Sequence, residues 1–357
     1  MKFLHMADLH LDTKFDSLSQ INGLPQKRRL EQRKALKQMI EYIKENEIEI
    51  FLISGDLYEQ KYIRKSSIEY INNLFKEIPN VQIFIAPGNH DPYIANSFYS
   101  SYPWSENVHI FKENIEKIDY KDIHIYGFGF TDYYCKQSEI EEIEIENKKD
   151  INILITHGAL DGSSDELREY NPIRETKLKK LGFDYIALGH IHKPYYNEEK
   201  NQKIVYPGSP ISLGFDELGT HGVISGEISK KELKLEFIQI DTREYVEKEI
   251  DITNLLSIEE IIEKIENLTL DEKNLYKIIL TGRRYFPIKL EEITKLINIE
   301  NIVKIRNHTK PGIDIEKLAQ ENTIKGIFVR RMLERKEKEN LDEDFVEKTI
   351  EIGLEVL

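Results

Sequence analysis

Five short apolar runs in the N-terminal part of the chain are each followed by polar residues that can bind a metal ion or transfer a proton. The runs cover residues 3–7, 48–54, 81–86, 151–156 and 185–188. Continuous apolar runs of this length are typical of strands that are buried on both faces of a sheet. The polar residues therefore lie where strands end, and α/β sheets place their functional groups at those ends.

Helical stretches are predicted between the first three runs, at residues 29–46 and 66–78. This alternation of strands and helices indicates an α/β fold over residues 1–241. Further short strands are expected at residues 108–111, 123–128, 204–206, 222–228 and 233–240, and the last three favour an antiparallel edge. The Glu-rich residues 138–150 are interpreted as a solvated connection or a short amphipathic helix.

The pattern changes near residue 241. Residues 245–307 follow the order strand, helix, strand, helix, strand, which predicts a small α/β module. Two amphipathic helices follow, with apolar residues Ile324, Ile327, Phe328, Met332 and Leu333 in the first and Phe345, Val346, Ile350 and Leu354 in the second, which Asp342 is placed to cap. We therefore expect three parts, residues 1–241, 242–312 and 313–357. The terminal helices either pack on their own domain or form a partner-docking hairpin, and the pattern leaves both open.

The composition is that of a multidomain enzyme, with 357 residues and 40% hydrophobic content. A formal charge of −14 argues against binding nucleic acid through overall electrostatics, because phosphate binding depends on Lys and Arg. A nucleic-acid role would need a partner or local basic patches. The candidate patches, each of which is more commonly a solvated face, are Lys61, Arg64 and Lys65; Lys177, Lys179 and Lys180; and Arg283 with Arg284.

Membrane and disulfide chemistry are not expected. No apolar run approaches the roughly 18 residues of a membrane span, and an acidic residue comes too early for a signal peptide. We therefore predict a cytoplasmic protein without membrane contact. The single Cys135 cannot form an internal disulfide and is expected to be a packed or surface residue rather than a nucleophile.

Seven residues after the apolar runs are candidate metal ligands: Asp8, His10, Asp56, Asn89, His157, His190 and His192. Carboxylate, imidazole and carboxamide donors without a thiolate suit Mn²⁺, Fe²⁺ or Zn²⁺ better than Ca²⁺ or a soft metal. Asp8 and His10 are two residues apart, as are His190 and His192, so both members of each pair can turn toward one ion at a strand end. Asp56 follows the flexible Gly55 and is suited to bridge two ions.

The order of these blocks resembles the calcineurin-like metallophosphoesterase family. The family's D-x-H, G-D, G-N-H-D/E, H and G-H-x-H blocks match residues 8–10, 55–56, 88–91, 157 and 189–192. The resemblance implies a β-sandwich flanked by helices in α/β/β/α layers, together with two divalent ions. It implies one ion held by Asp8, His10, Asp56 and His192, and a second held by Asp56, Asn89, His157 and His190.

Two residues beside these ligands are candidate catalytic groups. His90 does not fit as a ligand when the neighbouring Asn89 faces the metals, so we expect it to stabilise the transition state or protonate the leaving oxygen. Asp91 is expected to orient His90 and to raise the pKa of its imidazole. His5 is expected to pack against the sheet. The glycines that adjoin ligands are expected to let the backbone turn sharply, and they are Gly55, Gly88, Gly158 and Gly189.

Three further signatures resemble the bacterial DNA-repair nuclease branch of this family, which contains SbcD and YhaO-type proteins. They are residues 3–12 with Phe15; residues 55–58 and 206–210 with Phe215, Glu217 and Gly222; and residues 323–357. The branch implies a DNA exonuclease, with endonuclease activity left open, that usually depends on manganese and works in a DNA-repair complex with an SbcC-like coiled-coil ATPase. Residues 242–312 would correspond to a capping domain and the terminal helices to a partner-binding region.

Archaeal and eukaryotic nucleases of this family differ from the chain at one position: they carry a His three residues beyond the bridging Asp, where this chain has Glu59. Two other functions also stay open. A small-molecule or nucleotide phosphoesterase could use the same metal centre, although the length of chain after residue 241 favours the nuclease. A DNA-end scaffold with incidental hydrolysis is the other alternative, and a complete ligand set argues against it. The sequence also leaves a homodimer open.

Overall fold

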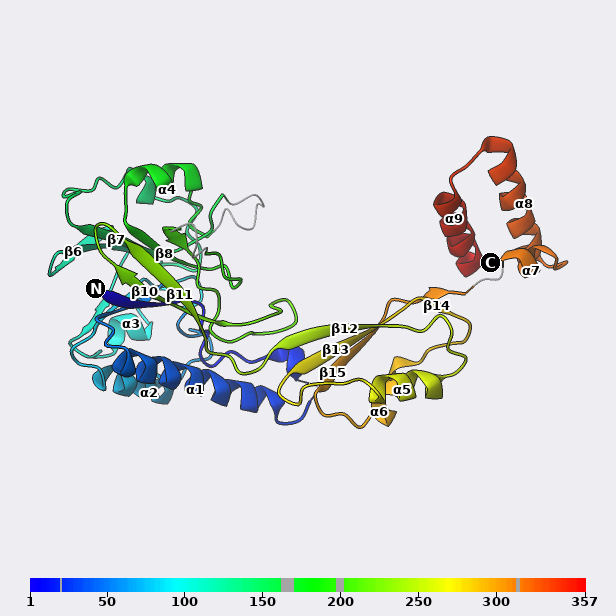
Figure 1. The fold of residues 1–357 in the computed structure, drawn as a ribbon, viewed down its shortest axis with the longest axis horizontal. Helices are drawn as coiled ribbons and strands as arrows, with labels where there is room; N and C mark the ends of the chain where they lie inside the picture. The colour runs from blue at the N-terminus through cyan, green and yellow to red at the C-terminus, as the bar shows by residue number, and fades with distance from the viewer. Residues whose placement is uncertain (20, 162–169, 197–201, 313–314) are drawn as a thin grey trace. The chain divides into compact units, whose positions relative to one another are not determined.

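The computed structural model describes residues 1–19, 21–161, 170–196, 202–312 and 315–357 (Figure 1). The chain divides into two compact units, Met1–Tyr245 and Val246–Leu357. None of the helices in these described ranges is both long and apolar enough to cross a membrane.

The first unit contains two sheets. One has the strand order β11-β10-β1-β2-β3-β4 and the other the order β5-β6-β7-β8-β9. The first sheet consists of β1 (Lys2–Met6), β2 (Ile50–Ile53), β3 (Gln82–Ile85), β4 (Val108–Ile110), β10 (Gly222–Ile228) and β11 (Leu233–Gln239). The second consists of β5 (Glu116–Tyr120), β6 (Ile123–Phe128), β7 (Ile151–His157), β8 (Tyr185–Gly189) and β9 (Ile204–Val205). Strands β1 to β4 are parallel, so the loops after β1, β2 and β3 emerge at one edge.

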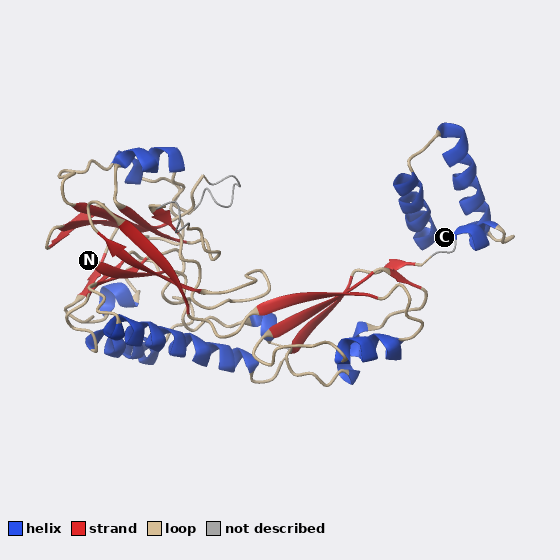
Figure 2. Cartoon of the chain, in the orientation of Figure 1, coloured by secondary structure: helices blue, strands red, loops and turns tan. Residues whose placement is uncertain are grey.

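Helices cover the outer faces of the two sheets (Figure 2). The helical elements of this unit are η1 (Asp16–Leu18), α1 (Leu24–Glu45), α2 (Lys65–Lys76), α3 (Phe98–Ser101), η2 (Ile140–Glu142) and α4 (Glu175–Leu181). On β2, Phe51 and Ile53 pack with residues of α1 and α2, whereas Ile50 and Leu52 pack with residues of the second sheet. Leu178 of α4 is buried against the outer face of that second sheet. The order of layers is therefore α/β/β/α, which confirms the predicted fold class.

Two local predictions need correction, and a third is made more specific. The strand near residue 204 was expected at an antiparallel edge, but β9 pairs in parallel with β8, which requires a crossover instead of a hairpin. Strands β10 and β11 are antiparallel, as predicted. Helix α1 begins at Leu24 instead of residue 29, because Pro25 occupies its first turn, where a missing N–H costs nothing. Within residues 138–150 the helical structure is limited to the short η2 turn.

The second unit begins with the α/β module in the predicted order of elements. These are β12 (Tyr245–Asp251), α5 (Ile258–Glu266), β13 (Leu275–Thr281), β14 (Arg283–Arg284), α6 (Leu290–Leu296), β15 (Ile302–Asn307) and β16 (Lys310–Pro311). Strands β12, β13 and β15 form one sheet, and β14 pairs with β16. Ile261 and Ile265 of α5 and Ile293 of α6 are buried in one cluster with Ile278 and Leu280 of β13, so both helices pack on this sheet.

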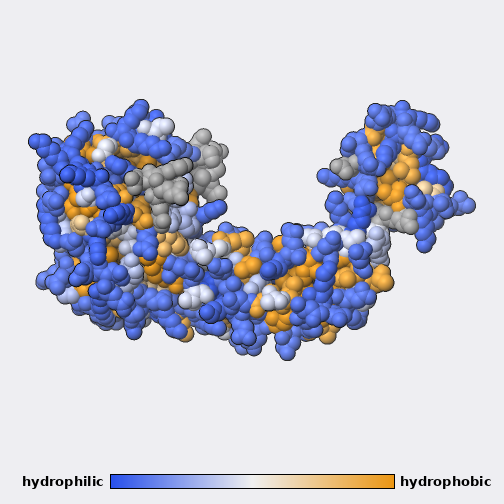
Figure 3. All heavy atoms as spheres, viewed as in Figure 1, coloured by the Kyte–Doolittle hydropathy of each residue, from blue (hydrophilic) through white to orange (hydrophobic). Residues whose placement is uncertain are grey.

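The chain continues into α7 (Ile315–Ala319), α8 (Ile324–Glu339) and α9 (Glu343–Val356). The Asp342 carboxylate accepts a hydrogen bond from the Phe345 N–H at 3.1 Å, which is the predicted N-cap. Val329 and Met332 of α8 pack against Val346 and Ile350 of α9, and Figure 3 shows hydrophobic surface on this pair of helices. Residues 313–314, the start of the predicted third part, lie outside the described residues.

Candidate metal centre

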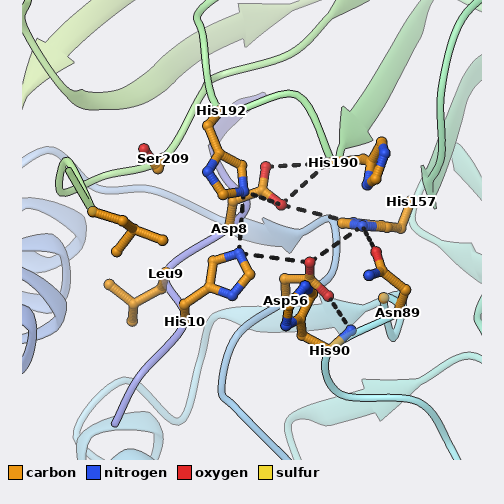
Figure 4. A network of polar contacts seen from close by, with 12 residues as sticks. Asp8, Leu9, His10, Asp56, Asn89, His90, His157, His190, His192 and Ser209 are labelled. Atoms are coloured by element: carbon orange, nitrogen blue, oxygen red, sulfur yellow. Dashed lines mark hydrogen bonds and ion pairs between the residues drawn. The ribbon is translucent and has the colours of Figure 1, made fainter. Parts of the chain in front are cut away.

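Polar residues at the ends of five strands from both sheets meet at one place (Figure 4). Three sets of described His and Asp side chains offer ligand atoms within 4.8 Å of one another: Asp8 with His10 and His192; His10 with Asp56 and His90; and Asp8 with Asp56 and His157. Asp56 Oδ2 lies 3.6 Å from Nε2 of His10 and 3.4 Å from Nε2 of His157. One oxygen of Asp56 therefore lies close to imidazoles from two different loops.

The Nδ1 atoms of three candidate ligands each contact an acceptor outside the ligand set. His10 Nδ1 is 2.8 Å from a Glu59 oxygen, and His192 Nδ1 is 2.6 Å from a Glu217 oxygen. His157 Nδ1 donates to the backbone carbonyl of Ser54, 2.9 Å away. Because these partners accept hydrogen bonds, Nδ1 carries the proton and Nε2 is the atom available to a metal ion.

The two carboxylates that contact these imidazoles are ionised. Burial raises the pKa of Glu59, but hydrogen bonds from His10 and His90 outweigh it and lower that pKa to about 2. Burial likewise raises the pKa of Glu217, but the hydrogen bond from His192 outweighs it and lowers that pKa to about 2. In the sequence, Glu59 stands out only as a difference from the archaeal and eukaryotic nucleases, and Glu217 only as part of a signature. Neither position carried a signal for its histidine contact, because the partners are 49 and 25 residues away.

Asn89 and His190 are placed differently from the other predicted ligands. The Asn89 side-chain oxygen lies 2.9 Å from Nε2 of His157, so it adjoins the cluster. The His190 backbone N–H donates to both oxygens of Asp8 at 3.1 Å. Its imidazole packs against the rings of His157 and Tyr170, with centroids 5.2 and 4.9 Å away, and belongs to none of the three sets found among the described residues.

The backbone is strained at four of these positions. The φ angles of Asp8, His10, Asp56 and His190 are 55°, 47°, 52° and 106°, in the region that residues other than glycine rarely adopt. The first loop is held by hydrogen bonds from the N–H groups of Asp8 and His10 to the carbonyls of Gly55 and Asp56, at 3.1 and 2.8 Å. Strain of this kind persists where surrounding contacts over-determine it, and it is concentrated at functional sites.

Two glycines beside the cluster allow close approach of chain segments. Gly55 has a φ of 87°, and a Cβ there would overlap the imidazole of His157. A Cβ on Gly189 would overlap the backbone carbonyl oxygen of Ser54. Space therefore requires glycine at both positions, and at Gly55 the left-handed backbone favours glycine as well.

Glu59 contacts the His90 imidazole, whereas the hydrogen bonds described for Asp91 go to other groups. Glu59 Oε2 lies 3.1 Å from His90 Nδ1. Asp91 instead accepts from three backbone N–H groups in the loops after β2 and β3 and from the Tyr99 hydroxyl, because these four buried donors surround its carboxylate. Burial lowers the pKa of His90, but the bond to Glu59 and the charges of Asp56, Glu59 and Asp91 outweigh it and raise the pKa to about 9, so Asp91 contributes to the raised pKa.

His5 is fully buried, as predicted. Its Nδ1 lies 2.8 Å from the Tyr185 hydroxyl and its Nε2 lies 2.9 Å from the Ser54 hydroxyl. Burial lowers the pKa of His5 to about 3, so its imidazole is neutral at physiological pH. Ser54 thus contacts His5 through its hydroxyl and the candidate ligand His157 through its carbonyl.

The sequence profile of the calcineurin-like phosphoesterase family matches residues 1–194, more than half of the chain. The chain belongs to this family. Among its relatives, an uncharacterized metallophosphoesterase, YhaO of Bacillus subtilis, is 24% identical over 75% of this chain and 67% of its own length. The SbcD subunit of the nuclease SbcCD from Staphylococcus epidermidis is 27% identical over 92% of each chain.

Two solved structures also resemble this calcineurin-like phosphoesterase. TT1561 of Thermus thermophilus has a TM-score of 0.39 and 11% identity, covering 66% of this chain and 98% of its own. The purple acid phosphatase PPD1 from yellow lupin seeds has a TM-score of 0.39 and 14% identity, covering 67% of this chain and 51% of its own.

The donor set of this calcineurin-like phosphoesterase fits divalent metal ions. Carboxylate oxygens and imidazole Nε2 atoms converge, and the Nδ1 contacts fix which ring nitrogen faces the cluster. Hard and borderline donors without a thiolate suit Mn²⁺, Fe²⁺ or Zn²⁺. The chain is therefore a metallophosphoesterase-family hydrolase with a candidate metal site.

Proposed function

We propose that this phosphoesterase hydrolyses phosphodiester bonds in DNA with two divalent ions, as the nuclease subunit of a cytoplasmic DNA-repair complex with an SbcC-like coiled-coil ATPase. The observation that carries the proposal is the position of Asp56 between His10 and His157 at the junction of the two sheets. Similarity to an SbcD subunit over 92% of both chains supports DNA as the substrate. Mn²⁺ is the proposed metal, with Fe²⁺ or Zn²⁺ as alternatives.

We assign one ion to Asp8, His10, Asp56 and His192, and the other to Asp56, Asn89, His157 and His190. The sets of converging ligand atoms support most of this assignment. The assignment of His190 rests on the family blocks alone, because its imidazole lies beside those sets.

When bound, the ions supply charge neutralisation for the phosphate and lower the pKa of the attacking water. His90 is the group of this chain best placed to act on the leaving oxygen. Its side chain is 45% exposed and is held by the ionised Glu59, which favours the cationic imidazole. A cationic imidazole can stabilise a phosphate oxygen and then donate its proton to the leaving group. Asp91 acts by fixing the loops after β2 and β3 that carry Asp56 and Asn89.

The second unit has proposed roles that extend from the same resemblance. Residues 242–312 would form the capping domain, and residues 313–357 would bind the ATPase. Part of α8 and α9 is suited to such a contact, since Ile327 and Phe345 are more than half exposed.

A direct test uses linear duplex, hairpin and single-stranded DNA with Mn²⁺, together with bis(4-nitrophenyl) phosphate as a generic diester. We expect nucleotide release by the wild type, loss after chelation, and a fall of about 100-fold or more in the His90→Ala variant. Equal release by the wild type, His90→Ala and Asp56→Asn would contradict the proposal. Hydrolysis of the generic diester without DNA would instead favour a small-molecule phosphoesterase.

A further inference from the structure

A cleft of about 530 Å³ opens beside the candidate metal centre. Asn89 and His90 line it, so any molecule bound there lies next to the proposed reaction site. Its volume is within the range of protein clefts that hold small organic groups. Four tyrosines also line the cleft, Tyr133, Tyr134 and Tyr170 together with Tyr62, which lies beside the two lysines Lys14 and Lys61.

The tyrosines extend a series of rings outward from a candidate ligand. Tyr170 lies 4.9 Å from the His190 ring, and Tyr134 stacks on Tyr170 at 6.0 Å with 29° between the ring planes. Tyr134 is 53% exposed and Tyr133 is 45% exposed. Aromatic rings that line a cleft while staying half in solvent offer a flat apolar face to a ligand.

Backbone contacts fix these rings to the metal centre. Cys135 and Tyr170 form a β-bridge, and the Asn171 N–H donates to the Cys135 carbonyl at 2.6 Å. The Asn171 side-chain amide donates to the carbonyl of His157 at 2.7 Å. The aromatic pair is therefore held in place before any ligand arrives, which lowers the entropic cost of binding.

Two lysines place cationic groups at this cleft, which the carboxylates of Asp16 and Glu59 also line. Lys14 Nζ lies 4.3 Å and Lys61 Nζ 5.6 Å from the centre of the Tyr62 ring. Within the part of the chain that the structure describes, neither lysine forms an ion pair with a carboxylate. In a protein with a net charge of −14, two such cations beside the proposed phosphodiesterase site favour the binding of phosphate groups.

We propose that this cleft is a subsite for an unpaired stretch of DNA, with a base stacked on Tyr134 and backbone phosphates near Lys14 and Lys61. The inference rests on the proposed function, because it names the form of DNA that the nuclease site takes. Bases inside a duplex are already stacked on both faces, so an unpaired base presents its face to a tyrosine more readily than a paired one. The subsite therefore selects single strands and frayed ends over fully paired DNA.

The test measures binding of the full-length protein in EDTA, so that it does not depend on hydrolysis. The probes are a fluorescein-labelled 12-nucleotide oligothymidylate and an abasic oligonucleotide of the same length, which keeps the phosphates and lacks the bases. We expect the wild type to prefer oligothymidylate by about tenfold. Tyr134→Ala should remove this preference and Tyr134→Phe should retain it. Lys61→Ala should weaken both probes alike.

Tyr195→Ala is the matched control, because Tyr195 is similarly exposed at 46% and is not among the residues that line this cleft. Equal affinity of the wild type for the two probes would overturn the subsite, as would loss of preference in Tyr195→Ala. A preference that survives Tyr134→Ala, in a variant whose melting curve matches the wild type, would also overturn it. A wild type that prefers oligothymidylate but releases no nucleotides with Mn²⁺ would contradict the nuclease proposal and leave the stacking subsite in place.

Discussion

The imidazole of His192 and the carboxylate of Glu217 face each other across 2.6 Å. Glu217 is itself held by the Ser209 hydroxyl and the Leu213 N–H, each at 3.0 Å. A carboxylate fixed in this way orients the ring and makes its other nitrogen a stronger electron donor. His10 has an equivalent partner in Glu59, whereas Nδ1 of His157 donates to a backbone carbonyl.

Replacing Glu217 with Gln should weaken metal binding. We expect the affinity for Mn²⁺ to fall about 10- to 100-fold, because the amide neither carries a charge nor favours the required ring tautomer. Isothermal titration of the metal-free protein with Mn²⁺ measures this directly. Glu141→Gln is a suitable control, since Glu141 pairs with Arg174 away from the cluster. An unchanged affinity in Glu217→Gln would show that the contact is structural.

Asp91 and His90 should give different phenotypes when each is replaced by Ala. Asp91→Ala leaves four buried donors without an acceptor, which should cost about 3 kcal/mol or more of unfolding free energy and weaken Mn²⁺ binding. His90→Ala should leave the unfolding free energy nearly unchanged and reduce hydrolysis. Urea unfolding combined with a DNA hydrolysis assay checks both. Matching stability losses in the two variants would contradict the separate roles given to Asp91 and His90.

His5 should make the first unit sensitive to acid. Its pKa in the folded protein, about 3, is below the ordinary value of 6.5, so the unfolded chain binds the extra proton first. The stability that this group provides is complete above pH 6.5 and is lost as the pH falls from 6.5 toward 3. In His5→Gln, the drop in unfolding free energy between pH 7 and pH 5 should be smaller by about 2 kcal/mol. Parallel pH profiles for the wild type and the variant would exclude this role.

Gly189 should not tolerate even one added carbon. Gly189→Ala would drive its Cβ into the Ser54 carbonyl, which also receives the His157 hydrogen bond. We expect a lower melting temperature and weaker Mn²⁺ binding. Gly214→Ala is the matched control, because a Cβ there meets only the Ser17 hydroxyl at an ordinary 3.6 Å. Similar melting and metal affinity in both variants would count against the steric argument.

The positions of the candidate ligands along the chain could be predicted from the sequence, but their surroundings could not. Asp8 and Asp56 follow apolar runs whose length indicates buried strands, so their convergence at one edge followed from parallel pairing. Their left-handed backbone had no such signal, because contacts across the sheet impose it. The hydrogen-bond donors to Asp91 could not be predicted, because they are backbone N–H groups. Every sequence contains such groups, and they surround the Asp91 carboxylate only once the loops have folded.

The candidate ligands come from loops of both sheets, and this has a consequence for the folding of the protein. A partly folded chain in which only one sheet has formed lacks the ligands from the other sheet. It therefore binds a metal ion only weakly. Metal ions that bind the folded two-sheet unit and not partly folded chains therefore increase the folded fraction by mass action. Removal of the bound metal would then increase the amount of incompletely folded chain exposed to proteases as well as the amount of inactive enzyme.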